Sequence, residues 1–294
     1  TKAPLIEGWC SPTSALGKVG EEVGRRVIRL TEADDLSNEE TVKSAMAEAR
    51  ANPGCHLHGS LPCTPWTSWQ RINLTKMKGD KLAALLASRV TSMEYVGTFT
   101  RLAKSVLSKG GSVSFEWPRG CDGWAQPAVQ QMVQDLKLDF VDIDGCAVGV
   151  MSQGGEKILK PWRFAVSSPH LAHSLRDRRC TRDHVHVRCS GRETAASAFY
   201  PAELCQAVHD GLDAHERSRR KGGGSFAIDQ AAASLLLAPQ GRTGNGPPRG
   251  ERTPPPGPTA PQAGKRSSSN SDMRVHTTCG GPPPPADGFC PGAP

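Results

Sequence analysis

The chain has 294 residues, enough for one α/β domain with a sizeable core, and its ten cysteines are too few for a small disulfide scaffold. Its net charge of +7 is unevenly placed: residues 1–213 hold 26 Lys and Arg against 24 Asp and Glu, whereas residues 214–294 hold 10 against 5. The first part therefore has no strong electrostatic footprint for nucleic acid, and most of the basic excess lies in the last part.

Composition also divides the chain at about residue 213. From Ala214 on, the sequence is rich in Pro, Gly, Ser and Arg, and 14 of its 24 prolines lie at or after Pro239. Such a segment buries too little apolar surface to offset the entropy that is lost on ordering. We predict a folded domain over 1–213 and a disordered tail over 214–294, with one short helix at 228–237.

Strand-like and helix-like runs alternate from the start of the chain. Short apolar runs predict strands at 3–6 and 26–30, and a helix is expected to begin near Ala15. A capping asparagine and a later Asn-Pro-Gly sequence delimit a predicted helix at 38–51. The apolar-leaning run at 55–61 predicts the next strand.

The alternation continues through the rest of the first part. Leucines and valines at helical spacing predict a long helix over 80–108, which two glycines end. The remaining predicted elements are a strand at 113–117, a helix at 127–136, a strand at 139–143, two arms of a hairpin at 148–151 and 163–167, and a closing helix at 201–212. This order predicts an α/β fold: a doubly wound, mostly parallel, Rossmann-like sheet with an antiparallel hairpin at one edge.

A cysteine directly after a proline, Cys63, follows the strand predicted at 55–61. Open α/β sheets bind their ligands at the carboxyl ends of the strands, and a thiol placed there can act as a nucleophile. Glu116 lies at the end of the next predicted strand, between apolar neighbours. The two positions predict a thiol and a carboxyl that act on one substrate.

The order of several short motifs resembles that of the DNA cytosine-5 methyltransferases. The resemblance covers about residues 3–210, and its motifs in chain order are Glu7-Gly8, an acid after the second strand, Pro62-Cys63, Phe115-Glu116 and Lys160-Pro161-Trp162-Arg163-Phe164. It implies the S-adenosylmethionine-dependent methyltransferase fold, S-adenosylmethionine as the cofactor, and a nucleic-acid partner, DNA rather than RNA. A base inside a duplex must be flipped out to be reached.

The resemblance also implies roles for three residues. Cys63 would add to carbon six of cytosine, so that carbon five can take the methyl group. Glu116 would hydrogen-bond and protonate the ring, and Arg163 would orient the base or the carboxyl. Structural alternatives stay open: Cys63 in packing, Glu116 as a turn cap or a partner of Arg119, and Arg163 paired with an aspartate of the preceding strand.

The cofactor side follows in the same way. The turn after the first strand would let the backbone approach the methionine part of the cofactor, and Glu7, Gly8, Cys10 and Ser11 occupy it. An acid at the end of the second strand commonly binds ribose hydroxyls, and Glu32 is the residue that we choose.

The chain departs from the family at several points. The first turn has one glycine where the family usually has two, and Trp117-Pro118 follows Glu116 in place of Asn-Val. Only about 35 residues separate Arg163 from Tyr200, where the family normally inserts a much larger DNA-reading domain. These departures keep two alternatives open: a catalytically inactive methyltransferase-like binding module, and an accessory domain of a larger, mobile-element polyprotein.

A second cluster of residues competes with this interpretation. Cys180, His184, His186 and Cys189 lie within ten residues, and they are the residue types that hold zinc. In an extended strand the two histidines would share one face. The spacing is not a common zinc pattern, so the sequence leaves the choice between a zinc site and no metal open.

The expected compartment follows from what the sequence does not contain. It has no signal peptide and no apolar run of about 18 residues, so we expect reduced thiols in an intracellular protein, with the nucleus as one compartment and no membrane partner. The chain begins at Thr1 without methionine, and its first residues already suggest a strand, so we expect a piece of a longer protein.

Overall fold

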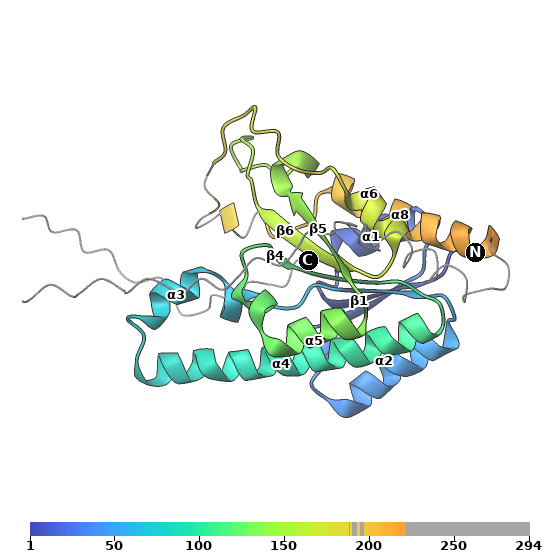
Figure 1. The fold of residues 1–294 in the computed structure, drawn as a ribbon, viewed down its shortest axis with the longest axis horizontal. Coiled ribbons are helices and arrows are strands. Elements are labelled where there is room, and N and C mark those ends of the chain that lie inside the picture. Colours follow the sequence, from blue (N-terminus) through green and yellow to red (C-terminus); the bar gives the residue numbers. More distant parts are fainter. Residues whose placement is uncertain (188, 190–192, 195–196, 222–294) are drawn as a thin grey trace, which may run out of the picture. The chain divides into compact units, whose positions relative to one another are not determined.

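The computed structural model describes residues 1–187, 189, 193–194 and 197–221. Within these residues, six strands form one sheet in the order β2-β1-β3-β4-β6-β5 (Figure 1). The strands are β1 (Leu5–Cys10), β2 (Val27–Thr31), β3 (His56–Gly59), β4 (Val113–Pro118), β5 (Asp139–Asp144) and β6 (Pro161–Val166). The helices are α1 (Ala15–Glu22), α2 (Glu39–Ala51), α3 (Trp69–Leu74), α4 (Gly79–Ser108), α5 (Pro127–Asp135), α6 (Pro169–Leu175) and α8 (Ala202–Lys221).

Strand directions confirm the predicted fold class. β1 pairs in parallel with β2 and β3, and β3 pairs in parallel with β4, whereas β6 is antiparallel to both β4 and β5. The prediction of the hairpin arms was partly wrong, because the arm that pairs with β6 is β5 and not 148–151. Val148 ends a short 3-10 turn, and Gly149 follows with a φ of 89°, which stops an extended strand there.

Each face of the sheet is covered by its own set of helices. α2, α4 and α5 pack on one face, where Phe99, Phe115 and Trp117 form successive ring contacts with centroids 5.3 and 4.9 Å apart. α1, α6 and α8 pack on the other face, around residues such as Leu5 and Phe164. Side chains alternate between the faces along each strand, so neighbouring residues of one strand enter different cores.

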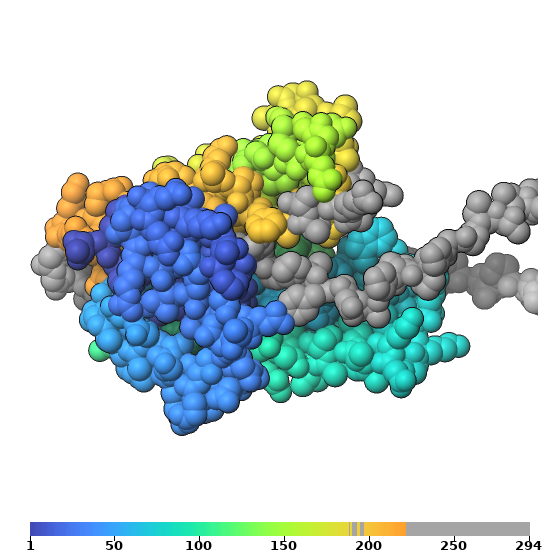
Figure 2. All heavy atoms as spheres, turned by 180° about the vertical axis from the view of Figure 1, so that it is seen from behind, coloured from blue at the N-terminus to red at the C-terminus, as the bar shows by residue number. Residues whose placement is uncertain are grey.

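Local signals set the ends of the helices. Ser14 caps α1 by accepting from the Gly17 N–H at 3.1 Å, and Asn38 caps α2 by accepting from the Glu40 N–H at 2.8 Å. α4 has 30 residues, about 45 Å of helix, and it lies along the lower edge of the molecule in Figure 2. None of the described helices combines the length and the apolar character that a membrane span requires.

Two predicted boundaries were wrong. β1 continues through the predicted turn, because Glu7, Gly8 and Cys10 are buried and pair with β2, so the turn begins only at Ser11. The predicted domain end at residue 213 falls inside α8, which continues to Lys221. Residues 222–294, with the helix predicted at 228–237, lie outside the described residues. Two short helices, α3 and α6, were not predicted.

Candidate active site at the carboxyl ends of the strands

The direction of chain progression reverses beside β1. From β1 the chain forms β2 on one side and later β3 on the other, so β1 and β3 flank the switch point of the sheet. Open α/β sheets bind ligands in the crevice that forms there, outside the carboxyl ends of the strands. The candidate site therefore lies at the carboxyl ends of β1, β3 and the adjacent β4.

A row of buried polar side chains crosses β3 and β4 on the face that α1, α6 and α8 cover. It arises from two alternating sequences, His-Leu-His-Gly-Ser at 56–60 and Ser-Val-Ser-Phe-Glu at 112–116, which send polar side chains to one face and apolar ones to the other. We call these six side chains the polar stripe. Its hydrogen-bonded pairs are His56 Nδ1 with Ser112 Oγ at 2.8 Å, His58 Nδ1 with Ser114 Oγ at 2.8 Å, and Ser60 Oγ with Glu116 Oε2 at 3.0 Å.

Glu116 ends this stripe and is 4% exposed. Its Oε2 accepts from Ser60 Oγ at 3.0 Å and from Tyr200 Oη at 2.9 Å, whereas Oε1 has no hydrogen-bond partner among the described residues. Burial raises the pKa of Glu116 to about 7, although both hydrogen bonds oppose the rise. Near neutral pH a large fraction of this carboxyl is protonated, and Oε1 is the atom that can serve a ligand.

The neighbouring His58 is held neutral. It is fully buried, and burial lowers the pKa of His58 to about 3. Its Nε2 lies 3.3 Å from Tyr200 Oη, and Tyr200 Oη also lies 3.1 Å from Ser60 Oγ. One tyrosine thus joins the second and third pairs of the polar stripe and fixes the position of Glu116.

Cys63 lies in the loop that leaves β3, three residues beyond Ser60. The loop is tied to β4, because Trp117 Nε1 donates to the Leu61 carbonyl at 2.8 Å. Cys63 itself is half-buried and begins a 3-10 turn that ends at Trp66, whose indole donates to Ser92 Oγ of α4 at 2.8 Å. The loop of Cys63 and the strand of Glu116 are therefore neighbours at the carboxyl ends of β3 and β4, but the Cys63 side chain packs against the core on the α2, α4 and α5 face, whereas Glu116 enters the opposite face.

Arg163 is not brought to Glu116. Glu116 pairs with Phe164 across the β4–β6 ladder, whereas Arg163 pairs with Trp117, so the two side chains leave opposite faces of the sheet. The Arg163 guanidinium instead donates to both carboxylate oxygens of Asp142, at 2.7 and 3.0 Å. The structure thus contains the alternative in which Arg163 pairs with an aspartate of the preceding strand.

Glu7 is the most deeply placed of the predicted cofactor residues. It is 2% exposed, its Oε2 accepts from Ser14 Oγ at 2.7 Å, and burial raises the pKa of Glu7 to about 7. Gly8 pairs with Gly59 of β3, which brings the two backbones together at the switch point. Because Glu7 is bound to the cap of α1, it holds the helix start against β1.

The end of β1 has a strained backbone. Trp9 has a φ of 57°, which a bulky residue rarely adopts, and the register with β2 shifts at this point. Its ring packs on Tyr95 at 5.6 Å, and its Nε1 is buried without a hydrogen-bond partner among the described residues. Cys10 Sγ donates to the Glu7 carbonyl at 3.2 Å, and burial raises the pKa of the Cys10 thiol. The Cys10 thiol is therefore a poor nucleophile, and its small side chain fills space in the core.

The last two predicted cofactor residues lie nearer to solvent. Ser11 is half-buried in the turn after β1, where its hydroxyl lies 3.2 Å from Thr13 Oγ1. Glu32 is exposed and begins a 3-10 turn directly after β2. Ser11 therefore lies at the carboxyl end of β1, which flanks the switch point, and Glu32 lies at the carboxyl end of the adjacent β2, where a ligand can reach them.

Three of the four predicted metal ligands converge. Cys180, His184 and His186 meet, but the fourth member of the cluster is Cys146 and not Cys189. Cys189 Sγ instead lies 3.3 Å from Ser197 Oγ. Sequence spacing could not reveal Cys146, because it lies far back in the chain, in the 3-10 turn after β5.

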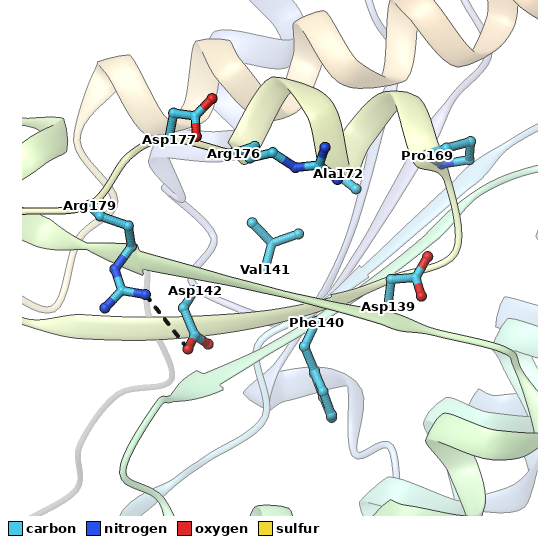
Figure 3. A pocket seen from close by; sticks show the side chains of 9 residues that line it. All are labelled: Asp139, Phe140, Val141, Asp142, Pro169, Ala172, Arg176, Asp177 and Arg179. Carbon is cyan, nitrogen blue, oxygen red and sulfur yellow. Dashed lines mark ion pairs between the residues drawn. The ribbon is translucent and has the colours of Figure 1, made fainter. Parts of the chain in front are cut away.

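Two surface hollows lie away from the polar stripe. One, of about 540 Å³, opens between β5 and α6, and Figure 3 shows Asp142 in it with Arg179 opposite. The other, of about 630 Å³, lies on α4 beside Trp66 and includes Leu86 and Val90. Neither is lined by Cys63, Glu116 or Glu7.

Comparison of the chain with protein-family models, with curated proteins and with solved structures finds no match. The functional argument therefore rests on the residues and geometry of this chain.

Proposed function

We propose that the chain is a divergent S-adenosylmethionine-dependent methyltransferase of the cytosine-5 type, which acts on nucleic acid, DNA rather than RNA, through Cys63. The observation that carries the proposal is the state of Glu116: a buried carboxyl with a pKa of about 7 and an Oε1 that bonds to no described residue. A general acid works best when its pKa lies near the operating pH. Ser60 and Tyr200 both donate to Oε2, so the acidic proton of Glu116 lies on Oε1, from which it would be donated.

The proposed chemistry divides between two strand ends. The Cys63 sulfur forms a bond to carbon six of cytosine while Glu116 donates its proton to the ring nitrogen, which makes carbon five electron-rich. The cofactor supplies an electrophilic methyl group when it is bound. After transfer, water takes the carbon-five proton and the sulfur–carbon bond breaks, which restores the aromatic ring and returns Cys63 to the thiolate that attacked, and the ring nitrogen returns its proton to Glu116.

The switch point offers groups of the kind that this cofactor needs. Glu32 is an exposed carboxylate after β2, where ribose hydroxyls are commonly bound. The buried Nε1 of Trp9 and the close backbone pairing of Gly8 with Gly59 lie at the carboxyl end of β1. Glu32 would accept hydrogen bonds from the ribose hydroxyls, and the backbone at Gly8 would lie beside the amino-acid tail of the cofactor.

A basic flank beside the Cys63 loop supports nucleic acid as the substrate. Residues 66–89, which span α3 and the start of α4, hold five Lys or Arg and one acid, although the described domain as a whole is nearly neutral. Lys76, Lys78 and Lys81 are exposed, and so is Trp69 at 59%. Phosphates favour such a flank, and an exposed indole can stack on a base.

One observation favours a second candidate, a non-catalytic binding module with the same fold. Arg163, which the resemblance makes catalytic, is bound to Asp142 on the opposite face from Glu116. A chain that has lost the base-orienting arginine could retain the cofactor pocket or the basic flank without the chemistry.

The first test is calorimetric binding of S-adenosylmethionine to the full chain. We expect micromolar binding, which Glu32→Ala weakens by about tenfold through the loss of hydrogen bonds to the ribose hydroxyls. Glu40→Ala is the matched control, because Glu40 is an exposed carboxylate on α2, beyond the site. Absence of binding by folded wild-type protein would overturn the methyltransferase proposal and leave the accessory-domain alternative.

The second test separates enzyme from binding module. A DNA oligonucleotide that contains a mechanism-trapping cytosine analogue should form a covalent adduct with the wild-type chain and with Cys189→Ser, but not with Cys63→Ala. Glu116→Gln should slow adduct formation by about 10²- to 10⁴-fold, the range for loss of a general acid. Cofactor binding without an adduct in the wild type would establish the non-catalytic module.

A further inference from the structure

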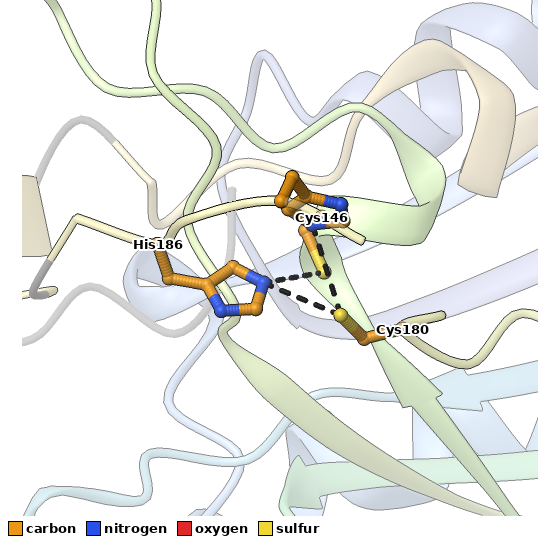
Figure 4. Close-up of side chains that lie close together, drawn as sticks. Cys146, Cys180 and His186 are labelled. Atoms are coloured by element: carbon orange, nitrogen blue, oxygen red, sulfur yellow. Dashed lines mark hydrogen bonds between the residues drawn. The ribbon is translucent and has the colours of Figure 1, made fainter. Parts of the chain in front are cut away.

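Four metal-binding side chains converge beyond the end of β5, away from Cys63 and Glu116. Cys146 comes from the 3-10 turn after β5, whereas Cys180, His184 and His186 come from the irregular segment after α6. One ligand atom from each lies within 4.8 Å of all the others. Figure 4 shows both sulfur atoms and the His186 ring facing one another from these two segments.

The distances between the ligand atoms suit one small cation. His186 Nε2 lies 3.3 Å from Cys146 Sγ and 3.4 Å from Cys180 Sγ, and His184 Nε2 lies 3.7 Å from Cys180 Sγ. A tetrahedral zinc ion with bonds of about 2.0–2.3 Å separates its ligand atoms by about 3.6 Å. These three separations are close to the edge of such a tetrahedron, and the remaining ones lie within 4.8 Å.

Groups around the four side chains support the same geometry. His184 Nδ1 lies 2.6 Å from Asp183 Oδ1, a carboxylate contact that orients the ring and leaves Nε2 for a metal. The Arg182 N–H donates to Cys180 Sγ at 3.3 Å, a bond that stabilises a thiolate. The Cys180 N–H donates to Asp144 Oδ2 at 3.0 Å, which ties the segment to the end of β5.

The segment that supplies three of the ligands is held by polar contacts more than by packing, among them the Arg179 Nε bond to Asp144 Oδ2 at 2.8 Å. It contains two residues in the left-handed region, Asp177 and Arg182, and Val185 is 88% exposed. Its pairing with the rest of the domain includes a single bridge from Val187 to Ile158. Apolar burial therefore contributes little here, and a bound ion would supply the missing stability.

We propose that Cys146, Cys180, His184 and His186 bind one zinc ion, which staples the segment after α6 to the end of β5. Cysteine and histidine in equal number select zinc rather than calcium or magnesium. All four positions of the tetrahedron come from the protein, so the site is closed and structural.

The test measures zinc bound to the full chain, purified under reducing conditions and given excess Zn²⁺ before removal of free metal. We expect about one zinc per chain in the wild type and below about a tenth of that in Cys146→Ser and Cys180→Ser. Cys189→Ser is the matched control, because Cys189 adjoins the same segment but contacts Ser197, and it should keep its zinc. No stoichiometric zinc in the wild type, or equal loss in Cys189→Ser, would overturn the proposal.

A second measurement covers the case in which the serine variants do not fold. Wild-type protein loaded with Co²⁺ should show the visible absorption of a tetrahedral ion and near-ultraviolet charge transfer from two thiolates. His184→Cys should keep the metal, because three cysteines and one histidine are also a zinc set, and its charge-transfer band should rise by about half. An octahedral spectrum, or an unchanged band in the folded variant, would exclude His184 and the proposed site.

Discussion

A carboxyl lies at each end of the polar stripe, but the groups that surround the two carboxyls differ in charge. At the amino ends of the strands, His56 Nε2 lies 3.2 Å from Glu216, and the fully buried Arg25 donates to Glu216 at 2.6 Å and to Asp213 at 2.5 Å. At the carboxyl ends, Glu116 receives only hydroxyl groups, and one of its oxygens bonds to no described residue. The carboxylate at the amino ends is therefore balanced by an arginine, whereas the carboxyl at the carboxyl ends is neutralised by protonation.

The pKa values of the two carboxyls express this difference. Burial alone would raise the pKa of Glu216, but hydrogen bonds from His56 and Arg25 outweigh it and lower that pKa to about 2. Burial of Glu116 is only partly offset by the hydrogen bonds from Tyr200 and Ser60 and by the charge of Lys160, so its pKa rises to about 7. A buried arginine thus makes one carboxylate a structural ion, whereas its absence makes the other a proton donor near neutral pH.

Among the substitutions that test this difference, removal of Arg25 should lower the free energy of unfolding most. Arg25→Ala leaves Asp213 and Glu216 without their buried counter-charge, so the free energy of unfolding should fall by about 3–5 kcal/mol. Urea denaturation measures it. Arg26→Ala is the control, because the Arg26–Glu48 pair is exposed and worth at most about 1 kcal/mol. Equal losses in the two variants would mean that the ion pairs at the amino end do not hold α8.

Neutralising each carboxyl should change stability with opposite signs. The folded protein keeps the Glu116 proton up to about pH 7, whereas the unfolded chain loses it near pH 4.5, so wild-type stability falls as the pH rises between these values. Glu116→Gln removes this penalty and should be more stable than wild type by about 1–3 kcal/mol at pH 8, with the gap closing toward pH 4.5.

Glu216→Gln should show the reverse dependence. Its folded pKa of about 2 lies below the unfolded value, so its contribution is present above pH 4.5 and is lost as the pH falls toward 2. The variant should lose about 1–2 kcal/mol at pH 7, a reduced figure because solvent screens part of the ion pair, and less at pH 3.5. Urea titrations of both variants across pH measure the two trends. Shifts of the same sign would refute the contrast between the ends.

The sequence predicted the sheet well because its signals are local. The alternating polar and apolar residues at 56–60 and 112–116 determine both strands and which side chains share a face, and the capping Asn38 determines the start of α2. The end of β1 was misplaced, because Gly8 suggested a turn although pairing on both sides keeps the strand extended. The end of α8 was misplaced because composition cannot show the tertiary anchor from Arg25 to Glu216.

The candidate site was predictable only in part. Cys63 follows β3 and Glu116 lies near the end of β4, and these strands are neighbours in the sheet, so motif order sufficed to bring their segments together. Tyr200 and Cys146 were missed because each joins its cluster through contacts between distant parts of the chain, Tyr200 with Glu116 and Cys146 with His186. The sequence could not show which face of the sheet the Arg163 side chain enters, because this depends on the register of β6 in the ladder, and a shift of one residue exchanges the faces.

Removal of the Tyr200 hydroxyl should give a small effect on stability and the sharpest view of the protonation state of Glu116. Tyr200→Phe takes one hydrogen bond from Glu116 Oε2 and leaves the ring in place. A hydrogen bond to an ionised carboxylate is stronger than one to a protonated carboxyl, so the loss should be about 2 kcal/mol at pH 8 and about 1 kcal/mol at pH 5. The same loss raises the pKa of Glu116 further, which moves the midpoint of this change upward.

Urea unfolding at the two pH values measures both losses in Tyr200→Phe. The matched control is Tyr95→Phe, since the Tyr95 hydroxyl donates to none of the described residues and its ring packs on Trp9 in the same way without it. That variant should change stability little and equally at both pH values. A Tyr200→Phe loss that does not depend on pH would mean that Glu116 stays in one protonation state between pH 5 and 8. The hydroxyl-lined end of the stripe would then be structural, as the arginine-paired end is, and Glu116 could not serve as the proton donor that the proposed methyl transfer requires.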